Sequence, residues 1–221
     1  YLLGGERDYF KKDFALNNYF MISKNSVLAS RFKLGRLWSW ENSYIDYSYE
    51  KCSGIRSYTP YPELSNESLE KALILIDQAK KPFVVWGQGV ILGNAEEEFK
   101  AFLEKSGIPA AWTILGLSAV STEHPSNRGM VGMHGNYAPN LLTNECDLLI
   151  AIGMRFDDRV TGDLNSYAKQ AKIIHLELDP AEVNKNVTVD VALLSDCKIS
   201  LQELTKRIAS KSYPEWVARF D

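Results

Sequence analysis

The sequence is poor in the residues that build metal sites and disulfide scaffolds. Its three cysteines, Cys52, Cys146 and Cys197, lie far apart and form no CxxC pair, which excludes a zinc motif and a disulfide framework. Free thiols are typical of a reducing compartment, so we expect a cytoplasmic protein. The three histidines lack the spacing of metal ligands. We therefore predict no metal site and treat each histidine as a structural or surface residue.

Charge and hydropathy exclude two further classes of protein. The net charge of -3 offers no basic surface for nucleic acid. No apolar run reaches the length of a membrane span, and the first ten residues lack a signal-peptide core. With 221 residues, 45% of them hydrophobic and 24% charged, the composition is that of an ordinary globular chain of one or two domains. We expect neither nucleic acid nor a membrane as a partner.

The composition and the apolar pattern of the chain change between residues 50 and 65. Residues 1–50 hold six of the eleven tyrosines and show no sustained period of 3.6 or of 2, so this N-terminal segment stays unassigned. Residues 51–64 contain one glycine and two prolines, which indicates a linker. The apolar pattern is regular from there on. We predict one domain over residues 65–210 and a C-terminal linker over residues 211–221.

Short apolar runs alternate with helical patterns in the predicted domain. Buried strands are expected over residues 83–86, 109–113, 147–152, 172–178 and 191–194, with one more short strand near Met130. Helices are expected from Ser65 or Asn66 to about residue 80, after a capping box of Asn94 and Glu97 up to Gly107, and over residues 137–143 and 199–208. Such alternation predicts right-handed βαβ crossovers and a parallel sheet.

A charged segment follows the strand over residues 147–152. It runs Gly153-Met154-Arg155-Phe156-Asp157-Asp158-Arg159-Val160-Thr161-Gly162, with two arginines and two aspartates within five residues. Charges crowded in this way must pair with one another or meet a charged ligand. Two interpretations are therefore open, a solvated ion-pair loop and a ligand-binding loop. Composition alone favours the first, whereas the place after a strand favours the second, because open α/β sheets bind ligands there.

Further polar or glycine-rich segments also follow strands. They are Gly87-Gln88-Gly89, Thr113-Ile114-Leu115, Glu177-Leu178-Asp179 and Ser195-Asp196, and together they predict a cleft for a dinucleotide at one edge of the sheet. Gly87 and Gly89 would let the backbone approach a phosphate. An ordinary NAD-binding Rossmann domain is disfavoured, because Leu92 takes the place of the third glycine of GxGxxG and Thr113, not an acid, ends the second strand.

From Thr59 to Asp221 the sequence resembles the central domain of the acetolactate synthase (acetohydroxyacid synthase) catalytic subunit, a thiamine-diphosphate enzyme. The pieces that carry the resemblance are Lys81-Pro82, Gly87-Gln88-Gly89, Gly107-Ile108-Pro109, Leu115-Gly116-Leu117 and residues 129–135, 147–162 and 172–186, in matching order and spacing. Residues 155–162 are the most specific to this family. A Rossmann-like (DHS-like NAD/FAD-binding) fold is implied, with a parallel six-stranded sheet, helices on both faces and FAD held in extended form.

The resemblance also implies a set of cofactor-binding residues. They are Gly87, Gln88 and Gly89 near phosphate and ribose; Thr113, Ile114, Leu115, Gly132, Met133 and His134 around the flavin; Gly153, Arg155, Asp157, Arg159 and Val160 across the cleft; and Glu177, Leu178, Glu182, Ser195 and Asp196 at the adenosine end. Met133 and Arg159 match residues of the family's substrate channel. No residue of this chain matches a catalytic residue or a metal ligand.

The whole enzyme of this family decarboxylates pyruvate and condenses the product with a second 2-oxo acid. The products are 2-acetolactate or 2-aceto-2-hydroxybutyrate, in branched-chain amino-acid biosynthesis. Thiamine diphosphate and Mg²⁺ belong to domains that this sequence does not match, since Leu164, not a GDG…N motif, follows Gly162-Asp163. We expect the chain to be part of this transferase and inactive alone. The implied partners are 2-oxo acids, further copies of the full-length protein and a regulatory small subunit.

Three other classes are alternatives. One is a non-catalytic FAD- or nucleotide-binding module, as in electron-transfer flavoproteins. Another is the central domain of a different thiamine-diphosphate enzyme, such as oxalyl-CoA decarboxylase or pyruvate oxidase, against which residues 155–162 argue. The third is a deacetylase of the sirtuin type, against which the lack of a four-cysteine zinc site argues.

Overall fold

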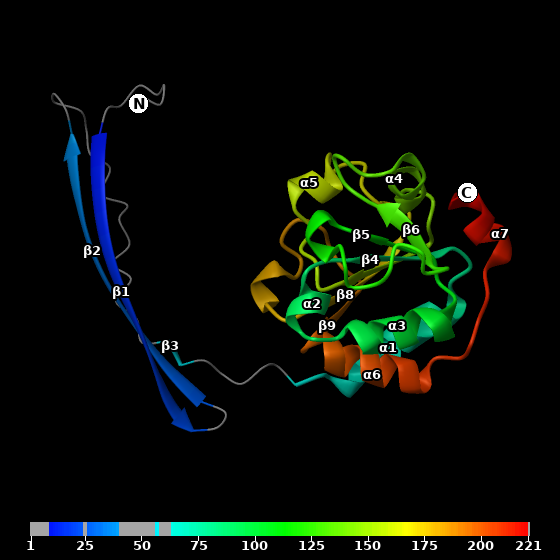
Figure 1. The fold of residues 1–221 in the computed structure, drawn as a ribbon, viewed down its shortest axis with the longest axis horizontal. Helices are drawn as coiled ribbons and strands as arrows, with labels where there is room; N and C mark the ends of the chain where they lie inside the picture. Colours follow the sequence, from blue (N-terminus) through cyan, green and yellow to red (C-terminus); the bar gives the residue numbers. More distant parts are fainter. Residues whose placement is uncertain (1–8, 24–25, 40–55, 58–62, 221) are drawn as a thin grey trace. The chain divides into compact units, whose positions relative to one another are not determined.

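A computed structural model describes residues 9–23, 26–39, 56–57 and 63–220 (Figure 1). The chain divides into two units, Tyr1–Pro60 and Tyr61–Asp221. In the first unit, β1 (Tyr9–Ser23), β2 (Ser26–Ser39) and β3 (Arg56–Ser57) form an antiparallel sheet in that order. The sequence pattern predicted no element over residues 1–50. Most of the predicted linker over residues 51–64 lies outside the described residues.

The second unit is built on a six-stranded sheet in which every neighbouring pair is parallel. Its strands are β4 (Pro82–Trp86), β5 (Ala110–Trp112), β6 (Asn127–Met130), β7 (Leu148–Ile152), β8 (Lys172–Glu177) and β9 (Val191–Leu194). Their spatial order is β6-β5-β4-β7-β8-β9, so the direction of winding reverses between β4 and β7. This is the doubly wound arrangement, and the predicted parallel six-stranded sheet is confirmed.

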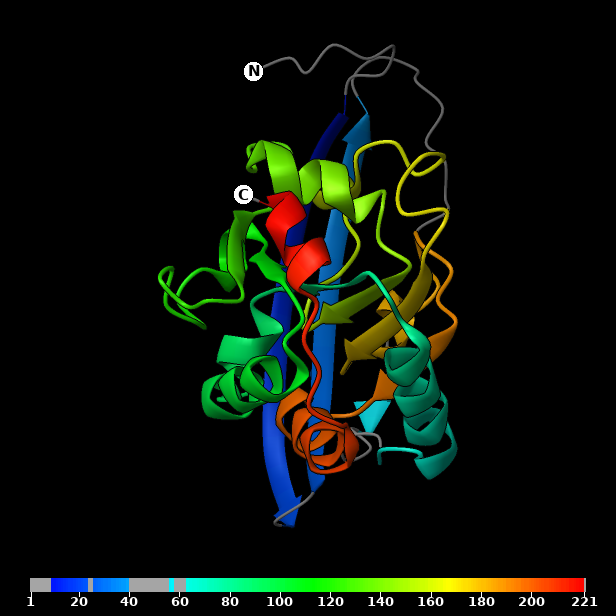
Figure 2. The same ribbon diagram turned by 90° about the vertical axis from the view of Figure 1, so that its right-hand side faces the viewer.

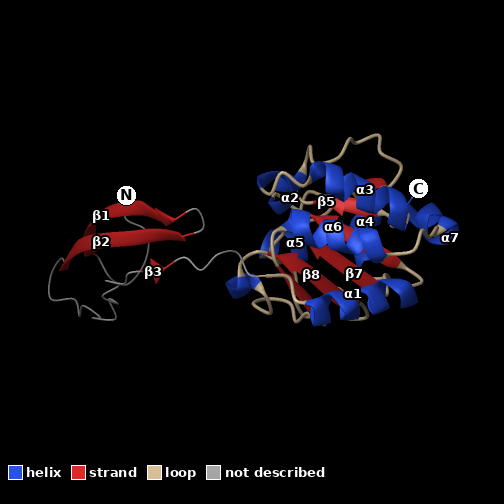
Figure 3. Cartoon of the chain, turned by 90° about the horizontal axis from the view of Figure 1, so that it is seen from below, coloured by secondary structure: helices blue, strands red, loops and turns tan. Residues whose placement is uncertain are grey.

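Helices cover both faces of this sheet (Figures 1 and 3). On one face lie α1 (Asn66–Gln78), α3 (Glu96–Ser106) and α6 (Cys197–Arg207), and on the other lie α4 (Tyr137–Thr143), α5 (Asp158–Thr161) and α7 (Pro214–Val217). Successive residues of a strand point to opposite faces. Val84 and Trp86 therefore enter the first core, and Phe83 and Val85 enter the second. No helix within the described ranges is long and apolar enough to cross a membrane.

The local sequence determines where α1 begins but not where α3 begins. Ser65 caps α1 as predicted, because its side chain accepts a hydrogen bond from the Ser68 N–H. The predicted capping box of Asn94 and Glu97 is wrong. A short helix α2 (Gly89–Leu92) comes first, Asn94 then takes a left-handed conformation (φ 47°), and α3 begins after Ala95 without a side-chain cap. Asparagine tolerates this conformation better than most residues.

The C-terminal segment packs into the second core (Figure 2). Trp216 of α7 and Phe220 of the 3-10 helix η3 (Ala218–Phe220) are both buried. The indole Nε1–H of Trp216 donates to the Pro82 carbonyl oxygen (2.8 Å), and the Phe220 ring lies 5.0 Å from the Phe83 ring. Residues within the predicted linker over 211–221 thus cover the start of β4.

We predict that Trp216→Ala destabilises the fold by about 3–5 kcal/mol, because it deletes a buried indole and a hydrogen bond. Urea unfolding followed by circular dichroism measures this loss. Tyr137→Ala is the matched control, since Tyr137 is 82% exposed, and its effect should stay within about 0.5 kcal/mol. Equal effects of the two substitutions would contradict the role of the C-terminal segment in the core.

Candidate functional site

The predicted site segments all follow the carboxyl ends of parallel strands. Gly87 follows β4, Thr113 follows β5, Gly153 follows β7, Leu178 follows β8 and Ser195 follows β9. Parallel strands end at one edge of their sheet, so these segments share that edge. The centre of the edge lies between β4 and β7, where the strand order reverses. Doubly wound sheets bind their ligands at this position.

The segments after β4 and β7 touch through their backbones. The Gly87 N–H donates to the Ile152 carbonyl oxygen (3.0 Å), and the Gly89 N–H donates to the Gly153 carbonyl oxygen (2.8 Å). A Cβ atom on Gly89 would lie 2.5 Å from Cα of Gly153, and one on Gly87 would lie 2.6 Å from the Gly153 oxygen. Glycine is therefore required at both positions for one segment to pack on the other. The sequence analysis explained these glycines only by the approach of a phosphate.

We predict that Gly89→Ala destabilises the chain by about 1–3 kcal/mol, because the added methyl group meets backbone atoms that cannot turn away. Thermal and urea unfolding measure the change. Gln88→Ala, at the exposed neighbouring position, serves as the control and should have little effect. A Gly89→Ala variant as stable as the wild type would show that the contact can relax.

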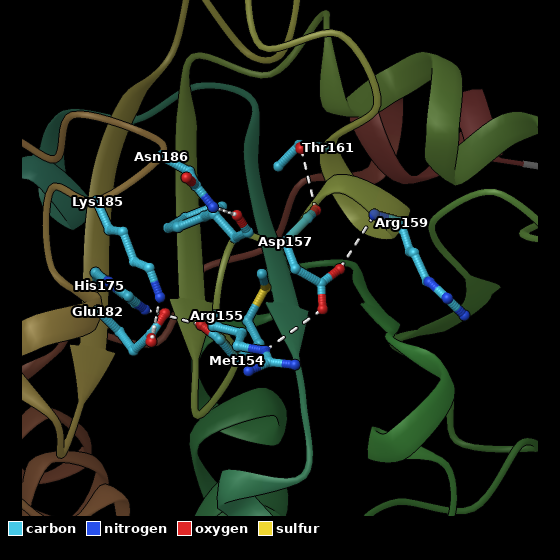
Figure 4. Close-up of polar contacts among 10 residues, drawn as sticks. Met154, Arg155, Asp157, Arg159, Thr161, His175, Glu182, Lys185 and Asn186 are labelled. Carbon is cyan, nitrogen blue, oxygen red and sulfur yellow. Dashed lines mark hydrogen bonds and ion pairs between the residues drawn. The ribbon is translucent and has the colours of Figure 1, made fainter. Parts of the chain in front are cut away.

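Burial alternates along the charged segment after β7. Met154 and Phe156 are buried, whereas Arg155 is exposed and Asp157 is partly exposed. The Arg155 Nε atom lies 3.4 Å from Asp157 Oδ2, and the dashed line between these side chains marks the pair in Figure 4. An exposed pair of this kind contributes little stability. Both charges are therefore available to a ligand.

Arg159 lies on helix α5, and its side chain points in a different direction from that of Arg155 (Figure 4). Asp157 caps α5 by accepting from the Arg159 N–H (3.1 Å), and the Thr161 hydroxyl donates to the Asp157 carbonyl oxygen (3.0 Å). The Arg159 side chain extends away from Arg155 (Figure 4). Within the described residues, its guanidinium is in no salt bridge.

A cavity of about 330 Å³ lies between α4, α5 and the loop after β6. Met133 and Arg159 both line it, and the Met133 N–H donates to the Arg159 carbonyl oxygen (2.8 Å). Asn140 of α4 supports the wall, because its amide group binds both the N–H and the carbonyl oxygen of Gly132 (2.8 and 2.9 Å). The structure therefore brings together the two residues predicted for a substrate channel.

Glu177, at the end of β8, is held in its ionised form. Its Oε1 accepts from the N–H groups of Leu178 (2.9 Å) and Asp179 (3.2 Å), and its Oε2 lies 3.6 Å from Nε2 of His175. Burial alone would raise the pKa of Glu177, but the His175 contact and the two N–H donors outweigh it and hold the pKa below its usual value. An ionised carboxylate only accepts hydrogen bonds. Oε2 is therefore suited to a hydroxyl donor.

The other predicted residues differ in what their side chains can do. Ser195 is buried with its hydroxyl 2.6 Å from that of Ser200, and Asp196 caps α6 by accepting from the Lys198 N–H (2.8 Å). Glu182 forms a salt bridge with Lys185 (2.7 Å). Thr113 is buried. Those that expose their side chains at the edge are Gln88, Ile114, Leu115, Met133, His134 and Leu178.

Two residues of the site were not predicted. His175 Nε2 binds the Met154 carbonyl oxygen (2.8 Å), and the Asn186 amide donates to the Phe156 carbonyl oxygen (2.6 Å). A histidine inside an apolar strand is a signal that the sequence does contain, whereas nothing local distinguishes Asn186. Among the described residues, no group of three His, Cys, Asp or Glu side chains could hold a metal ion.

The strand order and the loops at the switch point define a Rossmann-like domain of the doubly wound class. A family model described as "Thiamine pyrophosphate enzyme, central domain" matches residues 69–204. The chain therefore belongs to the thiamine pyrophosphate enzymes, through their central domain.

Curated relatives are acetolactate synthase large subunits. The chain is 44% identical over 151 residues to the probable acetolactate synthase large subunit of Methanococcus aeolicus, covering 68% of this chain and 25% of that protein. It is 39% identical over 182 residues to the acetolactate synthase large subunit of Corynebacterium glutamicum, covering 80% of this chain and 29% of that protein. The resemblance seen in the sequence is confirmed. The chain thus spans well under half the length of these relatives.

Proposed function

We propose that this chain is the central domain of an acetolactate synthase catalytic subunit and that it binds FAD along the carboxyl edge of its sheet. The family match and the names of the relatives support the enzyme. The observation that carries the cofactor site is the exposed Arg155–Asp157 pair directly after β7, at the switch point of the sheet.

The chemistry of the edge suits the parts of FAD. Arg155 can bind a phosphate through its planar guanidinium. The Glu177 carboxylate can accept a hydrogen bond from a ribose hydroxyl. Ile114, Leu115 and Met133 expose apolar side chains that an aromatic ring system could cover. When bound, FAD would be mostly structural, since the overall reaction involves no redox change.

The remaining assignments depend on which side chains already have hydrogen-bond partners inside the fold. Ser195 Oγ and Asp196 Oδ1 bind partners inside the fold, so we propose that these two residues take part chiefly through their backbone. Roles in the cleft are proposed for the other predicted residues, which are Gly87, Gln88, Gly89, Thr113, Gly132, His134, Gly153, Asp157, Arg159, Val160, Leu178 and Glu182.

In the whole enzyme the reaction would be decarboxylation of pyruvate and condensation with a second 2-oxo acid. Thiamine diphosphate and Mg²⁺ would be held by other parts of the protein. Arg159 would bind the carboxylate of the second 2-oxo acid with two parallel hydrogen bonds, beside Met133 in the cavity. We further propose a cytoplasmic homo-oligomer with a regulatory small subunit. The buried free thiols of Cys146 and Cys197 support a reducing compartment.

We predict that the 221-residue chain quenches the fluorescence of FAD on binding and that Arg155→Ala weakens this binding roughly tenfold to a hundredfold. The physical reason is the loss of a charge-assisted hydrogen bond to phosphate. Arg207→Ala removes an arginine of α6 that pairs with Glu70 and Glu203, away from the edge, and should leave the affinity unchanged. Absence of FAD binding by the wild-type chain would refute the proposed cofactor role.

We predict that Arg159→Lys in the full-length enzyme impairs capture of the second 2-oxo acid, because lysine keeps the charge but loses the planar fork. Product partitioning and the dependence of rate on the second substrate measure the effect. Arg155→Lys is the comparison and should act chiefly on FAD affinity. If Arg159→Lys lowers only FAD affinity and leaves the product ratio unchanged, the proposed substrate contact is wrong.

A further inference from the structure

His175 is a polar residue without any exposed surface. It lies in β8 beside Ala151 of β7 and Ala192 of β9, two small residues that leave room for an imidazole over the sheet. The Phe156 ring packs against it, with 5.0 Å between the ring centroids. A buried imidazole has lost its hydration and needs a hydrogen-bond partner in compensation. The identity of that partner indicates what His175 does.

The partner is a carbonyl group of the charged segment. His175 Nε2 lies 2.8 Å from the Met154 oxygen, and because a carbonyl only accepts, Nε2 carries the proton. Nδ1 is buried with no hydrogen-bond partner in the described part of the chain. The distance of 3.6 Å from Nε2 to Glu177 Oε2 is too long for a good hydrogen bond. The Met154 carbonyl is therefore the principal partner of this ring.

Two further contacts hold the backbone of the same segment. The Gly89 N–H binds the Gly153 oxygen (2.8 Å), and the Asn186 amide binds the Phe156 oxygen (2.6 Å). Figure 4 shows the His175 and Asn186 contacts on one side of the segment and the Arg155–Asp157 pair on the other. Fixing the carbonyl of Met154 thus fixes the direction in which Arg155 leaves the backbone.

We propose that His175 is a positioning residue of the cofactor site. Its Nε2–H holds the Met154 carbonyl and so sets the direction of Arg155 and Asp157, while its ring lies beside the Glu177 carboxylate. One buried imidazole thereby positions the group proposed for the phosphate, next to the carboxylate proposed for the ribose. The consequence for FAD rests on the proposed function, but the effect on the backbone of the segment does not.

Amide hydrogen exchange of the 221-residue chain without FAD tests the effect on the backbone. His175→Phe keeps a ring but removes the donor, whereas His175→Gln keeps a donor near the position of Nε2. We expect His175→Phe to speed exchange at the amides of Gly89, Asp157 and Arg159, and His175→Gln to restore protection toward the wild-type level. The control, Ile173→Val, trims the same core from the same strand and should leave these amides protected.

FAD binding by the same variants tests the effect on the ligand. We expect His175→Phe to weaken FAD binding roughly tenfold and His175→Gln to bind nearly as the wild type does. His175→Met replaces His175→Phe if the latter does not fold. If amide exchange is unchanged in His175→Phe, or in His175→Met where that variant replaces it, the positioning role is wrong. It is also wrong if the loss of FAD affinity parallels the loss of thermal stability in every variant, including Ile173→Val. Faster exchange together with a wild-type chain that binds no FAD supports the positioning of the segment and overturns the proposed function.

Discussion

The contact between Gly89 and Gly153 is the constraint on which the candidate site depends. Parallel strands β4 and β7 are neighbours and are buried on both faces, so their carboxyl ends emerge together at the centre of the sheet. The residues that follow the two strands pass within hydrogen-bonding distance, 2.8 Å from Gly89 N to Gly153 O. This approach leaves no space for a Cβ on either glycine. The chain then leaves toward α2 on one side and toward α5 on the other, and the charged segment is displayed at the edge between them.

The charged segment shows features of both interpretations, an ion pair at Arg155 and a cavity beside Arg159. Because the ion pair is exposed, Arg155 can still meet a phosphate. Arg155 forms the partly solvated ion pair with Asp157, as the first interpretation has it. Arg159 lines a cavity, as the second requires. Asp157 separates them, because one carboxylate oxygen faces Arg155 while the other caps α5 and turns the chain into the helix that carries Arg159. The two arginines of this segment thus lie in two different places, Arg155 at the sheet edge and Arg159 in the cavity beside α4.

A structural feature could be predicted from the sequence where neighbouring residues determine it, and could not where distant residues do. The central strands were predictable, because strands buried on both faces produce continuous apolar runs such as residues 147–152. The strands of residues 9–39 were not, since Lys11-Lys12-Asp13 and Asn17-Asn18 interrupt any apolar alternation. The start of α3 depends on the turn that α2 imposes on Asn94, which no capping pattern reveals. The partner of His175 lies 21 residues away, and only the tertiary fold brings it there.

Resemblance to a family places the backbone of a site, but the hydrogen bonds decide which side chains can act there. Glu177, Ser195 and Asp196 were all predicted at the adenosine end. The hydroxyl of Ser195 and the capping oxygen of Asp196 are occupied inside the fold, whereas Glu177 keeps Oε2 for a donor. Because a ligand must offer at least what an internal partner already provides, the exposed guanidinium of Arg155 and Oε2 of Glu177 are the groups that we propose for the cofactor. These two groups match phosphate and hydroxyl, which is the chemistry of a dinucleotide.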